Sequence, residues 1–190
     1  MLTYIIIFVS LYLIFSILEW IIHKYIMHND SNSIGKNHLI HHKSTTANMT
    51  LNKDNNEYKE LSSNENLCFD KEIIIAAVIF YIIYLYVLKS ITKNRLHLIF
   101  SFIVFIILIT FIFIGWNSVH AYIHHEDGKD KCKYALSYET VKKLHKKKNY
   151  IDLLVNNHIM HHKRKGNRKG NFCVTLIGAD HLFGTYYVKE

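Results

Sequence analysis

The sequence of 190 residues contains no proline. A cytochrome b5 domain carries a His-Pro pair in its haem loop, so we expect no fused domain of that type within these residues. The chain is rich in Ile, Lys, Asn and Tyr, which indicates a general compositional bias. We therefore assign no function to the missing proline itself.

Cysteine is scarce, and the three that occur, Cys68, Cys132 and Cys173, form no C-x-x-C pair. Widely separated single cysteines predict neither a disulfide framework nor a zinc site built from thiolates. The sequence also lacks an H-E-x-x-H motif, and this absence disfavours a zinc protease.

Charge is nearly missing from three long apolar runs. Residues 2–22 contain only Glu19, and residues 73–88 and 98–116 contain no charged residue. A helix needs about 17 to 25 predominantly apolar residues to cross a bilayer. The first run lacks the basic start and small-residue cleavage site of a signal peptide, so we expect it to stay in the protein. The sequence predicts an all-α integral membrane protein with about three transmembrane helices, over about 2–22, 73–89 and 97–116.

Positive charge is concentrated near the C-terminus. The formal net charge is +8, and 14 of the 23 Lys and Arg residues follow residue 126. By the positive-inside rule, residues 117–190 should form a cytoplasmic, histidine-rich helical cap. Three basic residues in the loop "KSITKNR" indicate the opposite orientation but are outnumbered. Two spans return the chain to its starting side, so the polar insert 44–72, expected as a surface loop or disordered segment, should face the same compartment. We expect residues 1–190 to form one domain.

The basic run "KKLHKKK" at 142–148 is typical of a solvated or anionic-lipid-facing helix beside a membrane. We expect no nucleic-acid partner.

Histidine is abundant, with 14 residues, most of them in four groups. Residues three and four apart share one helix face, so the H-x-x-H-H motif of "HLIHH" and "HIMHH" directs three imidazoles into one arc. Neutral imidazole is the commonest metal ligand, and ten such ligands are too many for one ion. The sequence therefore predicts two metal ions. The predicted ligands are His23, His28, His38, His41, His42, His120, His124, His158, His161 and His162.

Two of these assignments need comment. A separation of five residues does not keep His23 and His28 on one α-helical face, but nearby Glu19 could orient their rings. In "HAYIHH", His124 lies about 40° from His120 around a helix and His125 about 140°. This favours His124, although an H-x4-H pair using His125 stays open if the helix ends there. We expect the remaining histidines to be interface or surface residues: His97, His145 and His181.

The four boxes "HKYIMH", "HLIHH", "HAYIHH" and "HIMHH", in this order around a membrane hairpin, resemble those of the fatty acid hydroxylase and sterol desaturase superfamily. The tail "NFCVTLIGADHLFGTYY" is similar to that family's C-terminal signature, except that Ala179 stands where an aromatic residue is common. The resemblance extends from about Glu19 to Tyr187. "EWIIHKYIMH" also resembles the first box of carotenoid ring hydroxylases.

The resemblance implies an O2-dependent oxidoreductase with two non-haem Fe ions, for which zinc could substitute. It would hydroxylate or desaturate an unactivated C–H bond of a fatty acyl, sterol or related lipid taken from the bilayer. Electrons would come from a separate cytochrome b5 with its reductase, or from a ferredoxin. The boxes would face the cytoplasm, at the endoplasmic reticulum if the source is eukaryotic. Two alternatives stay open: a carotenoid ring hydroxylase and a non-catalytic membrane metal-binding protein.

Overall fold

The computed structural model describes residues 1–59, 68, 71–148, 150–163 and 169–188, without the side chains of residues 71–73. All regular elements in this part of the chain are helices, apart from one isolated bridge between Thr45 and Leu51. The predicted all-α class is confirmed. The elements are α1 (Leu2–Ile21), the π-helix η1 (Ile22–Met27), α2 (Ser33–Ser44), α3 (Asn56–Lys59), α4 (Lys71–Ile91), α5 (Arg95–Ile123), α6 (Gly128–Lys131), α7 (Tyr138–His145), α8 (Tyr150–Lys163) and α9 (Gly178–Leu182).

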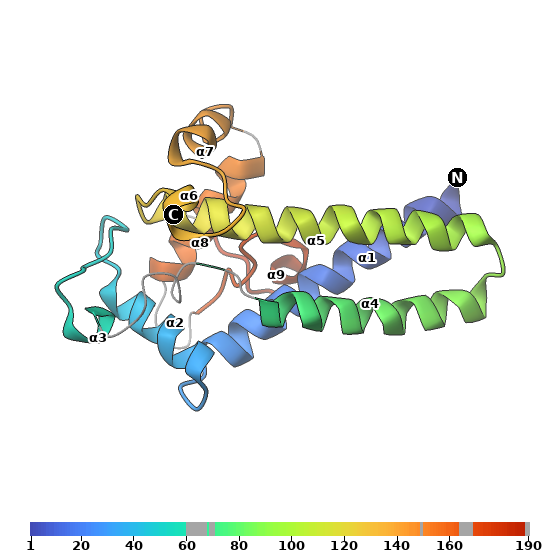
Figure 1. Ribbon diagram of the computed structural model, residues 1–190, viewed down its shortest axis with the longest axis horizontal. Helices are drawn as coiled ribbons and strands as arrows, with labels where there is room; N and C mark the ends of the chain where they lie inside the picture. The colour runs from blue at the N-terminus through green and yellow to red at the C-terminus, as the bar shows by residue number, and fades with distance from the viewer. Residues whose placement is uncertain (60–67, 69–70, 149, 164–168, 189–190) are drawn as a thin grey trace.

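Three helices are long and apolar enough to cross a membrane: Leu2–Met27, Ile74–Ile91 and Arg95–Ile123. α4 and α5 form a hairpin that packs beside α1, and the short helices gather at the far end from the α4–α5 connection (Figure 1). Side chains such as Ile82 and Ile107 are each 59% exposed on this hairpin, as expected of residues that face lipid. The prediction of membrane-spanning helices is confirmed.

Two spanning helices run further than the hydropathy pattern predicted. α5 ends at Ile123 instead of residue 116, and α1 continues through η1 to Met27. The α5 extension begins with polar residues that bond the cap: Ser118 Oγ accepts from the Leu136 N–H, and Asn117 donates to the Lys133 carbonyl. Both extensions contain histidines, which therefore lie on helices that continue beyond the predicted apolar runs.

The C-terminal tail packs against α1 through Glu19. One carboxylate oxygen accepts hydrogen bonds from the N–H groups of Val174 and Thr175, each at 2.8 Å. The other accepts from the Thr175 hydroxyl and the Leu176 N–H, each at 2.9 Å. Non-helical backbone at this depth needs internal partners because lipid offers none. Glu19 therefore orients the tail, and our expectation that it orients the rings of His23 or His28 was wrong.

A second carboxylate closes the tail on itself. Asp180 accepts from the N–H groups of Phe172 and Cys173 at 2.9 and 2.8 Å, and from the Thr185 hydroxyl at 2.8 Å. The Asn157 amide, on α8, donates to the Cys173 carbonyl at 2.6 Å. The tail thus links α8, which carries histidines, to α1, which continues directly into the histidine-bearing η1.

The cysteines differ from the sequence-based expectation. Cys68 and Cys132 form a disulfide with a Cα–Cα distance of 5.5 Å, whereas Cys173 is buried and free. The two partners are 64 residues apart in sequence, and only the folded chain brings them together. The bond joins the polar insert to the end of α6. The described part of this insert is also more ordered than expected, since it contains the Thr45–Leu51 bridge and α3; residues 60–67 and 69–70 lie outside the described residues.

Glu19→Gln should destabilise the protein strongly, because the amide replaces an acceptor of the tail N–H groups with a donor. Unsatisfied buried groups of this kind cost about 1 to 3 kcal/mol each, so we expect the melting temperature in detergent to fall by about 5 to 10 °C. The matched control is Glu57→Gln, which removes an exposed carboxylate in a 3.4 Å ion pair with Lys43 and should shift melting by less than about 2 °C. Equal melting temperatures for both variants would contradict the role given to Glu19.

Candidate metal centre

Ten histidines converge where η1, α2, α5 and α8 meet. They form two groups of five, and within each group one ring nitrogen per residue lies within 4.8 Å of all the others. These ten are the residues that the sequence singled out as ligands. The first group contains His23, His28, His38, His42 and His161, and the second contains His41, His120, His124, His158 and His162. The prediction of two histidine sets that could each hold a metal ion is confirmed; that these residues bind metal stays a prediction.

The consecutive histidines of α2 and α8 divide between the two groups. On α2, His38 and His42 join the first group while His41 joins the second. On α8 the roles are exchanged, since His158 and His162 join the second group and His161 the first. Neighbouring residues on an α-helix point about 100° apart, so each His-His pair separates two sites instead of crowding one.

The remaining pair of the first group depends on an irregular helix. His23 lies within η1 and His28 directly follows it, and a π-helix bonds residues i and i+5. The two rings stack at a centroid distance of 5.3 Å with an interplanar angle of 21°. The π-turn thus places residues five apart on one face, which a regular α-helix would not do. In the second group, His120 and His124 follow the ordinary spacing of four at the end of α5.

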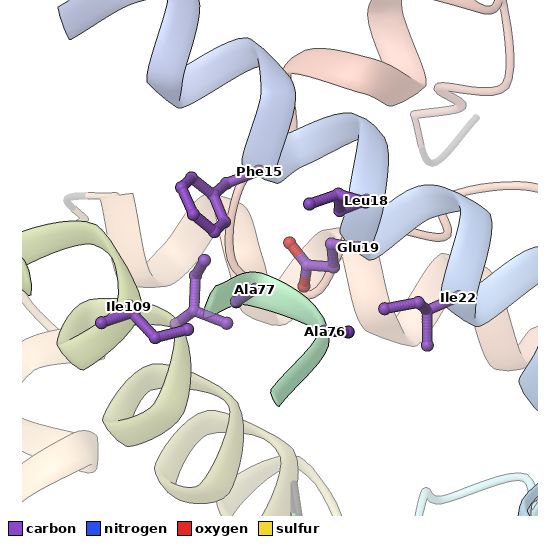
Figure 2. A pocket seen from close by; sticks show the side chains of 8 residues that line it. Phe15, Leu18, Glu19, Ile22, Ala76, Ala77 and Ile109 are labelled. Carbon is purple, nitrogen blue, oxygen red and sulfur yellow. The ribbon is translucent and has the colours of Figure 1, made fainter. Parts of the chain in front are cut away.

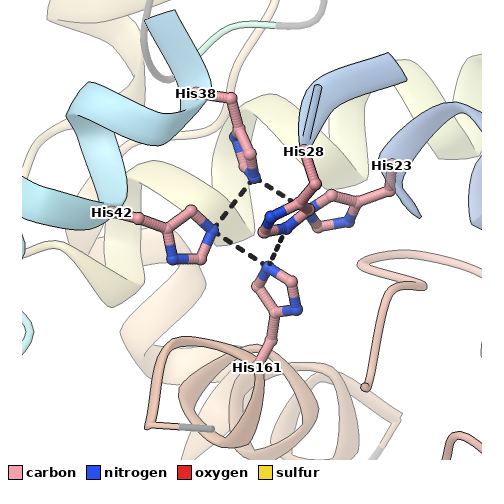
Figure 3. A group of neighbouring side chains, drawn as sticks. All are labelled: His23, His28, His38, His42 and His161. Carbon is pink, nitrogen blue, oxygen red and sulfur yellow. Dashed lines mark hydrogen bonds between the residues drawn. The ribbon is translucent and has the colours of Figure 1, made fainter. Parts of the chain in front are cut away.

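The spacing of the ring nitrogens fits a coordinated ion. In the first group, the Nε2 atom of His38 lies 3.0 Å from the Nε2 atoms of both His23 and His42. The Nε2 atom of His161 lies 3.0 Å from that of His42. Figure 3 shows these rings pointing toward a common centre from three helical segments. Metal–nitrogen bonds of about 2.1 Å that meet at right angles place the nitrogens about 3.0 Å apart.

Backbone carbonyls fix which nitrogen faces inward. The Nδ1 atoms of His161 and His124 lie 2.8 Å from the carbonyl oxygens of Gly170 and Met49, and His23 Nδ1 contacts the Phe172 carbonyl. A carbonyl oxygen only accepts, so each Nδ1 must carry the proton and each Nε2 is left with a free lone pair. His124 Nε2 is buried and has no hydrogen-bond partner in the described part of the chain. A metal ion would satisfy this nitrogen.

The rings are held neutral, as ligands must be. Burial and the neighbouring imidazoles lower the pKa of six of them well below the usual range, and burial lowers the pKa of His28 to about 4 and of His161 to about 3. At pH 7 these imidazole rings are therefore unprotonated, and each has a nitrogen lone pair available to bind a metal cation. The six are His38, His41, His42, His124, His158 and His162.

The other four histidines lie in neither group. His125 is exposed, because α5 ends at Ile123 and His125 itself adopts a positive φ of 60°. His97 contacts the Thr92 hydroxyl, His145 lies between Tyr122 and Asp152, and the exposed His181 packs against the ring of Tyr186.

The groups that support the ligands were not predicted from the sequence. The carbonyls of Phe172, Gly170 and Met49 have no sequence signature, because any residue offers one. Trp116 was missed as well, although it lies four residues before His120. It is 1% exposed, and its ring lies 5.6 Å from the ring of His23 and 5.4 Å from that of His120, so it separates both histidine groups from the apolar span.

A small pocket lies among the membrane-spanning segments of α1, α4 and α5 (Figure 2). Its walls are mainly apolar, for example Phe15, Ala77 and Ile109, and Glu19 also lines it. Its volume of about 20 Å³ is close to the room that one water molecule needs. The pocket is therefore too small for a lipid chain as the helices stand.

Replacing His124 should remove metal, whereas replacing its neighbour His125 should not. His124→Ala deletes a buried ligand of the second group, and we expect the metal content to fall from about two ions per chain to about one. His125→Ala is the matched control, since the side chain is exposed and outside both groups. Elemental analysis of purified, folded protein checks this. Loss of metal from the His125 variant alone would show that the H-x4-H interpretation is correct.

Comparison of the chain with protein-family models, with curated proteins and with solved structures gave no match.

Proposed function

We propose that this chain is a membrane-bound, O2-dependent lipid hydroxylase or desaturase with two iron ions. The observation that carries the proposal is the pair of adjacent five-histidine groups at the ends of apolar helices. The sequence resemblance to the fatty acid hydroxylase and sterol desaturase superfamily supports the same function.

Imidazole donors suit iron, and zinc could substitute during overexpression because it has the higher general affinity for nitrogen sites. When bound, the two irons would supply the oxidation of an unreactive C–H bond with O2, which no side chain achieves alone. Each group offers five donors, which is more than the four of a closed tetrahedral zinc site. If all five bound one six-coordinate ion, one position would stay free for a reactant. This favours a reactive centre over a purely structural one.

The chain's own residues would exclude water and present the lipid. Seven of the ten proposed ligands are buried and the other three are half-buried, and Trp116 closes the site toward the span. An apolar substrate could approach from the bilayer only if helices part, and the pocket near Ala77 marks where α4 meets α1. A slender acyl chain needs a smaller opening than a ring system does, so we favour a fatty acyl substrate over a sterol.

We further propose that the cap faces the cytoplasm, where a separate cytochrome b5 with its reductase, or a ferredoxin, would deliver electrons. The basic cap supports this orientation through the positive-inside rule. The Cys68–Cys132 disulfide opposes it, since disulfides persist mainly in oxidising compartments. A eukaryotic protein of this kind would reside in the endoplasmic reticulum.

Two other functions fit the histidine groups less well. A carotenoid ring hydroxylase would pair His120 with His125, whereas the structure places His124 beside His120 and leaves His125 exposed. A non-catalytic metal-binding protein needs no free coordination position and no contact with an apolar span.

Expression of the chain in a heterologous host should create hydroxylated or desaturated lipids that are absent from the host alone. His161→Ala should abolish them, because His161 is a buried member of the first group. His181→Ala is the control, since that ring is exposed and contacts only the ring of Tyr186 among the described aromatic side chains. Mass spectrometry of total lipids makes the comparison. Unchanged lipids despite two bound metals per chain would favour the non-catalytic alternative.

The orientation has its own test in the Asn48-Met49-Thr50 sequon, whose Asn48 is exposed. With a cytoplasmic cap, Asn48 stays unglycosylated in a eukaryotic host, and an epitope at the C-terminus is reached by antibody once the plasma membrane alone is permeabilised. An N-terminal epitope should remain protected. Glycosylation of Asn48 would place the cap in the oxidising compartment that the disulfide favours, and our orientation would be wrong.

A further inference from the structure

A second site lies on the outer face of α5, away from the histidine groups. An apolar groove of about 480 Å³ runs along α5 from Ile106 to Val119 and continues beneath α7, where Val141 and Leu144 line it. Its lower part belongs to a membrane-spanning helix, and Ile106 and Ile107 are 44% and 59% exposed there. The groove is therefore open to the hydrocarbon of the bilayer.

α7 is fixed above this groove by specific contacts. Val141 is buried in a cluster that includes Val119. The Tyr122 hydroxyl, on α5, bonds His145 Nδ1 at 2.9 Å, and His145 Nε2 lies 3.1 Å from Asp152 on α8. α7 thus lies across the end of the spanning helix, where lipid headgroups begin.

The residues above the groove carry unbalanced positive charge. Lys142 pairs with Glu139 at 3.0 Å, and Asp152 is engaged by His145. Four further lysines are exposed and form no ion pair within the described residues: Lys143, Lys146, Lys147 and Lys148. An apolar groove that opens into lipid and ends below a cluster of cations matches one chemistry, namely a lipid with an anionic headgroup.

We propose that α7, the basic run 146–148 and the α5 groove form a binding site for an anionic phospholipid, with one acyl chain in the groove and the phosphate near the lysines. The site lies outside the proposed metal centre and does not depend on its activity. It would hold the cap against the membrane surface.

The test compares phosphatidylserine and phosphatidylcholine with identical acyl chains, titrated against the purified full chain in detergent. Each lysine near an anionic lipid contributes roughly a factor of five in affinity. We therefore expect at least about tenfold preference for phosphatidylserine, and loss of this preference when Lys143, Lys146 and Lys147 are all replaced by Gln. The matched control replaces Lys36, Lys129 and Lys133, which are exposed and lie outside α7 and the run 146–148, and should keep the preference.

A second variant tests the groove independently of charge. Thr110→Trp fills the groove from an exposed position of α5 and should weaken both lipids about equally. Ile103→Trp, on the same helix but outside the groove, should change neither. Helix content and melting temperature verify that each variant is folded.

Three results would overturn the proposal. The first is equal affinity of the unaltered chain for the two lipids. The second is an equal loss of preference in the control lysine variant, which would show a general charge effect. The third is displacement of phosphatidylserine by a short RNA or by the soluble glycerophosphoserine headgroup alone, which would show that no acyl chain is recognised.

Discussion

The rest of the structure depends on one interaction, in which the Glu19 carboxylate accepts four hydrogen bonds from the C-terminal tail. A carboxylate on an apolar helix is costly unless it is fully hydrogen-bonded. Here it is satisfied by three consecutive residues of a tail that begins more than 150 positions later. The same tail supplies the Phe172 and Gly170 carbonyls that hold His23 and His161. A contact made within the span thereby orients ligands from both ends of the chain.

The two histidine groups are built as one unit. α2 and α8 each contribute to both groups through consecutive histidines, and the ring of His42 stacks on that of His162 across the boundary at 4.2 Å. A rotation of either helix would displace ligands in both groups at once. The arrangement also explains why the motif H-x-x-H-H occurs on these two helices, since only they face both groups.

The three spans and the ten clustered histidines follow from the sequence because hydropathy and helical spacing are local properties. Helical spacing also favoured His124 over His125 as the predicted ligand. The role of Glu19 and the Cys68–Cys132 bond could not be predicted, because each joins segments that only the fold brings together. The π-turn after Ile21 was missed for another reason: periodicity arguments assume a regular helix, and the spacing of His23 and His28 then counts as evidence against a site.

Because α2 and α8 each contribute histidines to both groups, the binding of one metal ion would affect the binding of the other. An ion in the first group would fix His38 and His42 on α2 and His161 on α8, and so hold His41, His158 and His162 in place before a second ion arrives. The ordering cost would be borne mainly by the first ion. Metal uptake should then be positively cooperative, with singly loaded protein a minor species at every stage of assembly.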